Sequence, residues 1–146
     1  DHIVYTRMRA PYLNKDGFRF RIYRKGLFTA VEKLLGLQDI QVGYPAFDRD
    51  FIIQGNQEDK VKALFSNARI RQLIEQLPSI FLEVRDDEGY FRETFPEGVD
   101  ELLCLLEDSL VNLDQLKSLF ELFSETLNHL CHIGSAYEND PNLELP

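Results

Sequence analysis

Residues 47–77, FDRDFIIQGNQEDKVKALFSNARIRQLIEQL, decide the fold of this chain. Residues 47–54 alternate in hydrophobicity, which predicts a strand, and two short amphipathic helices follow it. We expect Asn56 to cap the first helix and Ser66 or Asn67 to cap the second. A strand followed by two capped helices favours an α+β domain, and no catalytic motif stands in this stretch.

The rest of the chain predicts a mainly antiparallel sheet built from two hairpins and covered by helices. Alternation on both sides of Asn14-Lys15-Asp16-Gly17 predicts the first hairpin over residues 4–24. The second hairpin is predicted from arms at 80–85 and 90–95. Other expected elements are a helix at 27–35, a strand at 40–42, and a segment at 99–107 that fits either a helix or an edge strand.

A long C-terminal helix is predicted after a capping box at Asn112 and Gln115. Its apolar residues repeat every three or four positions, at Leu113, Leu116, Phe120, Phe123, Leu127 and Leu130. Such a stripe packs on its own sheet or forms a dimer seam, and Leu119 and Leu122 widen it in favour of the sheet. Gly134 is expected to end the helix. We therefore expect one α+β domain over residues 1–135 and a polar, poorly ordered tail over 136–146.

Composition fits one globular domain. The chain has 146 residues, of which 44% are hydrophobic and 28% charged. Its net charge of −9 is uneven: residues 1–75 carry 13 Lys and Arg against 9 Asp and Glu, and residues 76–146 carry 3 against 16. An acidic chain is a poor general binder of nucleic acid, so we expect no nucleic-acid partner.

Cysteine use and hydropathy indicate a cytoplasmic location. Cys104 and Cys131 both stand among leucines, which favours buried thiols in a reducing compartment over a disulfide. The sequence has no signal peptide and no apolar run of the roughly 20 residues that a membrane span needs. Because the chain begins with Asp1, we treat an N-terminal extension with an inner-membrane anchor as open.

The strongest candidate binding surface is a set of basic and aromatic residues on the first predicted hairpin. If its arms pair in simple register, Arg7, Arg9, Arg19 and Arg21 share a face, beside Tyr23. Four like charges on neighbouring strands repel one another unless something anionic covers them. The surface would then bind another protein or an anionic surface. The alternatives are a solvated face and a face covered by acidic groups of the second half.

Two other constellations carry weaker signals. Asp48 and Asp50 share a face of the predicted strand, as in a hydrolase-like carboxylate pair, or they form salt bridges with arginines. His129, Cys131 and His132 have helical spacing, but a closed zinc site needs more ligands, so we predict neither a metal nor a cofactor. Nucleophile-elbow, P-loop and dinucleotide-binding motifs are missing.

Six runs resemble a family of uncharacterised bacterial proteins that has a Phe-Asp-x-x-Phe strand motif and a Leu-rich helix pair. They are FDRDFIIQGN, EDKVKALF, IRQLI, IFLEVRDDEG, FPEGVDEL and LFELF. The resemblance covers residues 40–130, with YTRMRAPY and GFRFRIYRKG added. It implies a compact α+β domain whose longer relatives often carry membrane-spanning helices upstream, and it implies no activity.

The sequence thus predicts a non-catalytic interaction or regulatory domain. Its alternatives are a hydrolase-like enzyme using Asp48 and Asp50, and an assembly module that forms a homodimer through the C-terminal helix.

Overall fold

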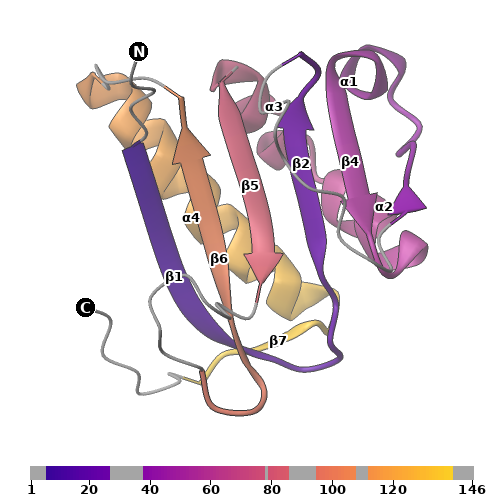
Figure 1. Cartoon of the computed structure of the whole chain (residues 1–146), viewed down its shortest axis with the longest axis vertical. Helices are drawn as coiled ribbons and strands as arrows, with labels where there is room; N and C mark the ends of the chain where they lie inside the picture. The colour runs from indigo at the N-terminus through magenta and orange to yellow at the C-terminus, as the bar shows by residue number, and fades with distance from the viewer. Residues whose placement is uncertain (1–5, 27–37, 78, 86–94, 108–111, 140–146) are drawn as a thin grey trace.

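The computed structural model describes residues 6–26, 38–77, 79–85, 95–107 and 112–139. They form one α+β unit, as the sequence predicts, with a seven-stranded antiparallel sheet in the order β3-β4-β2-β5-β6-β1-β7 (Figure 1). The strands are β1 (Thr6–Asn14), β2 (Phe20–Arg24), β3 (Gln38–Asp39), β4 (Phe51–Gly55), β5 (Ile80–Arg85), β6 (Val99–Leu106) and β7 (Ala136–Tyr137). The helices are α1 (Pro45–Asp50), α2 (Glu58–Phe65), α3 (Ala68–Gln76) and α4 (Leu113–His132).

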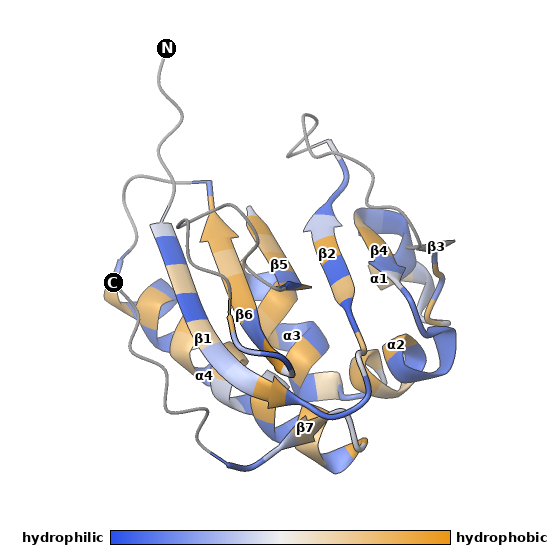
Figure 2. Cartoon of the chain, turned by 60° about the horizontal axis from the view of Figure 1, so that its bottom comes forward, coloured by the Kyte–Doolittle hydropathy of each residue, from blue (hydrophilic) through white to orange (hydrophobic). Residues whose placement is uncertain are grey.

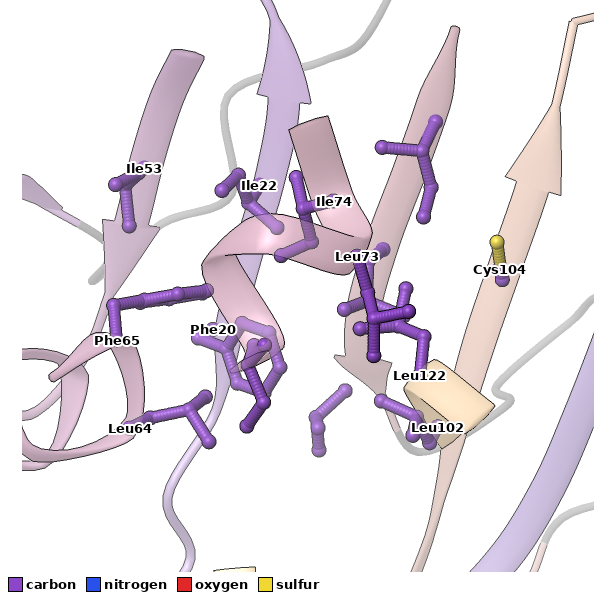
Figure 3. Close-up of a cluster of buried hydrophobic side chains, with 14 of the residues drawn as sticks. Phe20, Ile22, Ile53, Leu64, Phe65, Leu73, Ile74, Leu102, Cys104 and Leu122 are labelled. Carbon is purple, nitrogen blue, oxygen red and sulfur yellow. The ribbon is translucent and has the colours of Figure 1, made fainter. Parts of the chain in front are cut away.

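The core lies between one face of the sheet and the helices. Alternate residues of each strand point to this face, so Ile22, Ile53 and Cys104 meet side chains from α2, α3 and α4 (Figure 3). Leu73 of α3 and Leu122 of α4 are fully buried there. No described helix combines the length and apolar character needed to cross a membrane.

The first predicted hairpin is wrong. Its turn forms, because Asn14 Oδ1 accepts hydrogen bonds from Asp16 N (3.2 Å) and Gly17 N (2.9 Å), and Gly17 has a φ of 75°. The strands on either side do not pair: β1 pairs with β6 and β7, whereas β2 pairs with β4 and β5. Burial of Phe18 and a hydrogen bond from Arg19 N to Asn56 Oδ1 (2.8 Å) carry the chain to the other half of the sheet.

The second predicted hairpin is also wrong in its return arm. β5 pairs antiparallel with β6, from Ile80↔Leu106 to Arg85↔Glu101. Of the predicted arm at 90–95 only Phe95 is described, and it lies outside any strand. The ambiguous segment at 99–107 is a strand, and it is internal because β5 and β1 flank it. Burial on both faces explains its nearly continuous apolar sequence.

The stretch that decides the fold contains one error. Residues 45–50 form α1, so only the second half of the predicted 47–54 strand is a strand. Pro45 stands in the first turn of α1, where its missing N–H costs nothing. The strand expected at 40–42 is β3, two residues earlier, and the helix expected at 27–35 lies outside the described residues.

Both helices of that stretch are confirmed, with one cap as predicted. Asn67 caps α3, and its side chain accepts hydrogen bonds from Arg69 N and Ile70 N. Asn56 does not cap α2, because its side-chain oxygen is bonded to Arg19 N. The same residue thus joins the start of β2 to the start of α2.

The C-terminal helix and its capping box at Asn112 and Gln115 are confirmed. The predicted tail is too long, because residues 136–137 form β7. Gly134, with a φ of 81°, lets the chain reverse after α4, and Ser135 N then bonds Leu130 O (2.8 Å). This reversal brings Ala136 opposite Asn14 on β1.

Gly55 at the end of β4 is required by close packing. A Cβ there would lie 2.4 Å from a methyl of Val61, which is fully buried on α2. We expect Gly55→Ala to lower the free energy of unfolding by about 1–3 kcal/mol, because a β-branched side chain cannot turn away. Urea titration of a double-mutant cycle with Val61→Ala is the measurement: the Ala at 55 should cost less once Val61 is truncated. Equal costs in both backgrounds would contradict the clash.

Candidate functional site

An arginine–glutamate network (Arg9, Arg21, Glu83, Arg85 and Glu101) crosses the sheet on the face opposite the helices. Glu101 on β6 accepts from Arg9 Nε at 2.7 Å and from Arg85 Nε at 3.0 Å. Glu83 on β5 accepts from Arg21 Nη2 at 3.0 Å. Arg85 Nη1 lies 3.5 Å from Glu83 Oε1, which joins the two halves. Four strands are therefore tied side by side by charge.

The network is buried. The Glu101 side chain is fully buried, and the Arg9 and Arg21 side chains are 10% and 7% exposed. The Arg9 guanidinium lies over the ring of Phe95, 5.9 Å from its centre, and the Arg21 guanidinium lies 5.3 Å from that of Phe81. Charges so placed are stable only when paired, which the two glutamates achieve.

Four of the five predicted binding residues do share this face, although their strands are not neighbours. Arg7 and Arg9 are on β1, Arg21 and Tyr23 are on β2, and β5 and β6 lie between them. Arg19 precedes β2 and pairs instead with Asp100 (3.3 Å).

Arg9 and Arg21 fit the alternative in which acidic groups of the second half of the chain pair with the arginines. Glu83 and Glu101 both belong to that half and bond them directly. The binding role of these residues stays a prediction.

Asp48 and Asp50 do not form a carboxylate pair. Asp48 is on α1 and accepts from the backbone N–H groups of Val42 and Gly43, both at 2.9 Å. Asp50 is bonded to Arg49 Nε at 3.0 Å, and this hydrogen bond lowers the pKa of its carboxyl group. The predicted shared strand face of Asp48 and Asp50 is wrong, because both residues are on α1. The hydrolase alternative itself stays a prediction.

The helix-end histidines have structural partners. His129 Nε2 lies 3.0 Å from Ala63 O and its ring stacks on that of His132, 5.4 Å between centres. Among the described residues, no three His, Cys, Asp or Glu side chains converge as metal ligands would. The acidic turn at 86–88 lies outside the described residues.

The C-terminal helix carries the two most exposed of the large hydrophobic side chains in the described residues. Leu119, Leu122 and Leu130 are fully buried, but Leu113 and Phe120 are 65% and 59% exposed. The helix crosses the sheet diagonally, and in both Figure 1 and Figure 2 its first turns extend beyond β1. The predicted apolar stripe therefore has two parts. The buried leucines pack on the sheet, and Leu113 and Phe120 lie on the part of the helix that extends beyond β1.

The outer edge of β1 lies next to this overhang. Within the described part of the chain only β7 pairs with that edge, and it reaches only Leu13 and Asn14. A groove of about 830 Å³ lies where β1, β7 and the last turns of α4 meet. Its lining includes Tyr12, Leu127, Cys131, His132 and Tyr137. We call this edge from Thr6 to Tyr12, with Leu113, Phe120 and the groove, the β1–α4 flank.

Tyr12 lies at the inner wall of the groove. The residue is 5% exposed, and its hydroxyl group has no hydrogen-bond partner in the described part of the chain. Burial raises the pKa of this phenol, and the nearby carboxylates of Asp100 and Asp16 raise it further. The hydroxyl is therefore neutral across the physiological range.

The groove contains a natural reporter thiol. Cys131 is partly exposed in its lining, whereas Cys104 is fully buried in the core, and burial raises the pKa of the Cys104 thiol far above its usual range. We expect a maleimide to modify Cys131 in the native protein and Cys104 only after unfolding. Peptide mass mapping before and after denaturation measures this. Modification of Cys104 at the rate of Cys131 would contradict the structure.

Sequence reasoning did not find the flank, although one signal pointed to it. Adding Leu119 and Leu122 to the predicted stripe makes the apolar face wider than one sheet contact can cover. The residues at its far side, Leu113 and Phe120, are the ones left exposed.

No family model, no curated protein and no solved structure matches this chain. The resemblance to uncharacterised bacterial proteins stays a prediction.

Proposed function

We propose that this chain is a non-catalytic interaction domain that binds a protein partner at the β1–α4 flank. One observation carries the proposal: two large apolar side chains of α4, Leu113 and Phe120, are more than half exposed where the helix extends beyond β1, next to the groove. Isolated exposed apolar residues are ordinary, but two large ones beside a groove are typical of binding surfaces.

The flank is a better candidate than the arginine-rich face. Arg9 and Arg21 are already ion-paired with carboxylates and mostly buried. An anionic surface or an acidic partner would have to displace Glu101 and Glu83 to reach them, which leaves buried charge unpaired. This argues against the arginine-rich face as the main contact. The free thiols support a cytoplasmic location, which we propose together with the function.

Site-specific photocrosslinking tests the proposal. A benzophenone side chain replaces Phe120 in one variant and Gln76, an exposed polar residue of α3, in a control. In lysate of the source organism we expect a discrete adduct from position 120 and none from position 76. Excess wild-type chain should suppress the adduct, and excess Phe120→Asp should not.

Two results would count against a partner protein. If position 120 gives no adduct beyond that of the control, the flank is not an interaction surface. If the purified chain alone gives an adduct of twice its mass, and sedimentation shows a dimer, the chain is the assembly module that the exposed helix stripe also favours.

A further inference from the structure

The groove of the β1–α4 flank is aromatic and carries one negative charge. It lies where β1, β7 and the last turns of α4 meet (Figure 2). Its lining includes two tyrosine rings, those of Tyr12 and Tyr137, and one carboxylate, that of Glu138. Among the described residues, no lysine or arginine lines it. The lining therefore suits a ligand that carries positive charge and can stack on aromatic rings.

Two side chains of the lining experience a negative field. Burial raises the pKa of the Cys131 thiol, and the carboxylate of Glu138 raises it further. Burial likewise raises the pKa of the Tyr12 phenol, and the carboxylates of Asp100 and Asp16 add to this shift. The field that disfavours a negative charge on these two groups favours a positive charge on a ligand beside them.

Two cations near this end of the sheet lie outside the lining of the groove. Lys15 Nζ lies over the ring of Tyr137, 5.4 Å from its centre, and Arg19 pairs with Asp100 at 3.3 Å. Glu138, by contrast, has no ion-pair partner within the described ranges. Lys15 shows that the Tyr137 ring already accepts one cation, and Glu138 is a carboxylate that remains for a second.

The hydroxyl group of Tyr12 is a buried polar group that a ligand could satisfy. It has no hydrogen-bond partner among the described residues, and such a group lowers stability until a partner reaches it. A guanidinium group is planar, stacks on aromatic rings and has several N–H donors. It offers donors for both the Tyr12 hydroxyl and the Glu138 carboxylate, which an apolar side chain does not.

An apolar line on α4 leads into the groove. Leu113, Phe120 and Leu127 follow one another at intervals of seven residues, so they lie on one side of the helix. Leu127 is in the lining of the groove, and the other two are exposed. Phe120 and Leu127 are separated by about 10 Å along the helix axis. A partner segment that follows this line would cover Phe120 with apolar side chains and bring its next residues to the groove.

We propose that the groove takes an arginine side chain of the partner protein, stacked against the tyrosine rings and paired with Glu138. This inference rests on the proposed function and names the residue type by which the partner is recognised. Apolar residues of the same partner segment would contact Phe120. The apolar contacts would supply affinity, and the arginine would supply specificity.

The first test measures the groove alone, with N-acetyl-arginine amide as the probe and the whole chain as the protein. N-acetyl-citrulline amide has nearly the same shape without the charge, and we expect it to bind at least about fivefold more weakly. N-acetyl-phenylalanine amide should also bind more weakly. Titration followed by NMR measures the three affinities, and bound arginine probe should slow the modification of Cys131 by maleimide. Equal binding of the citrulline probe, or tighter binding of the phenylalanine probe, would overturn the inference.

Removing the carboxylate tests its role as the counter-charge. Glu138 is exposed, so Glu138→Gln should keep the fold, checked by circular dichroism. It should weaken binding of the arginine probe by at least about fivefold and leave the citrulline probe unaffected. Glu75→Gln, at an exposed position of α3, is the matched control and should change neither affinity. An unchanged ratio of the two affinities in Glu138→Gln would contradict the pairing.

Tyr12→Phe separates binding from folding. Because the hydroxyl group has no partner in the free domain, its removal should leave the urea midpoint unchanged or raise it. The same substitution should weaken binding of the arginine probe, since the guanidinium group loses an acceptor. A lower midpoint with unchanged affinity would show that the hydroxyl group serves the fold alone, contrary to the inference.

The photocrosslinking experiment distinguishes this inference from the proposed function. Glu138→Gln should lower the yield of the adduct formed from position 120, and Glu75→Gln should not. If position 120 crosslinks a partner but neither Glu138→Gln lowers the yield nor the arginine probe binds, the arginine inference is wrong and the interaction domain stands. If position 120 gives no adduct, both proposals fail.

Discussion

Replacing Glu101 with Gln is expected to lower the free energy of unfolding by about 3–5 kcal/mol. Glu101 is fully buried and accepts hydrogen bonds from both Arg9 and Arg85. The glutamine keeps the shape but removes the charge, so two mostly buried guanidinium groups lose their shared counter-charge. Guanidinium chloride titration followed by circular dichroism measures the loss.

A matched control separates burial from ion pairing as such. Glu121 on α4 is also bonded to an arginine, Arg69 of α3, but that pair is exposed to solvent. We expect Glu121→Gln to leave the unfolding midpoint almost unchanged, because water screens an exposed pair. If Glu101→Gln costs less than about 1 kcal/mol, the network is not the electrostatic tie across the sheet that its geometry indicates.

Phe65→Ala should destabilise the domain by a similar amount, about 3–5 kcal/mol. Phe65 is the last residue of α2 and is fully buried. Its ring contacts Phe20 of β2 edge-on, 5.7 Å between centres (Figure 3). It also contacts the ring of Phe47 of α1, 5.9 Å between centres. Truncation removes contacts with two other elements at once and leaves a cavity that the surrounding strands cannot close.

The same substitution at the surface is the control. Phe120→Ala on α4 removes an equally large ring that is 59% exposed, and we expect a change within about 0.5 kcal/mol. In thermal and chemical unfolding, the loss of stability should therefore be several-fold larger for Phe65→Ala than for Phe120→Ala. A large loss at Phe120 would show that the ring packs against the domain, and the β1–α4 flank would then not be an open surface.

Local patterns were enough for most of the elements. The spacing of Leu119, Leu122 and Leu130 fits a helix only, and the capping box at Asn112 marks its start. Asn67 likewise marks the start of α3. The error at α1 is also local: Phe47 and Phe51 are four residues apart, which suits one face of a helix turn as well as a strand, and Pro45 is the signal that was missed.

Strand pairing was the part that local patterns could not determine. The turn at Gly17 has the chemistry of a hairpin, yet a turn fixes only the direction of the chain and not the partner of the next strand. The strands that pair with β2 follow from the contacts of Phe18 with the core and of Arg19 with Asn56, which are distant in sequence.

The candidate sites divide in the same way. The sequence identified Arg9 and Arg21 as residues whose charge must be balanced, and it named the acidic half as one source of the balance. Only the sheet order decided that Glu101 and Glu83 stand beside them, because each pair joins strands that are far apart in the chain.

By itself, the amino-acid sequence determined the class of domain, the helices with their caps, and the alternation that gives each strand a buried face. These features depend on residues within one or two turns of each other, where propensity and hydrophobic period act. The tertiary structure alone decided the order of the strands, and through it which strand lies at the edge beneath α4. The β1–α4 flank exists because a long helix crosses a sheet whose last long strand is β1, and that is a property of packing between segments distant in the chain.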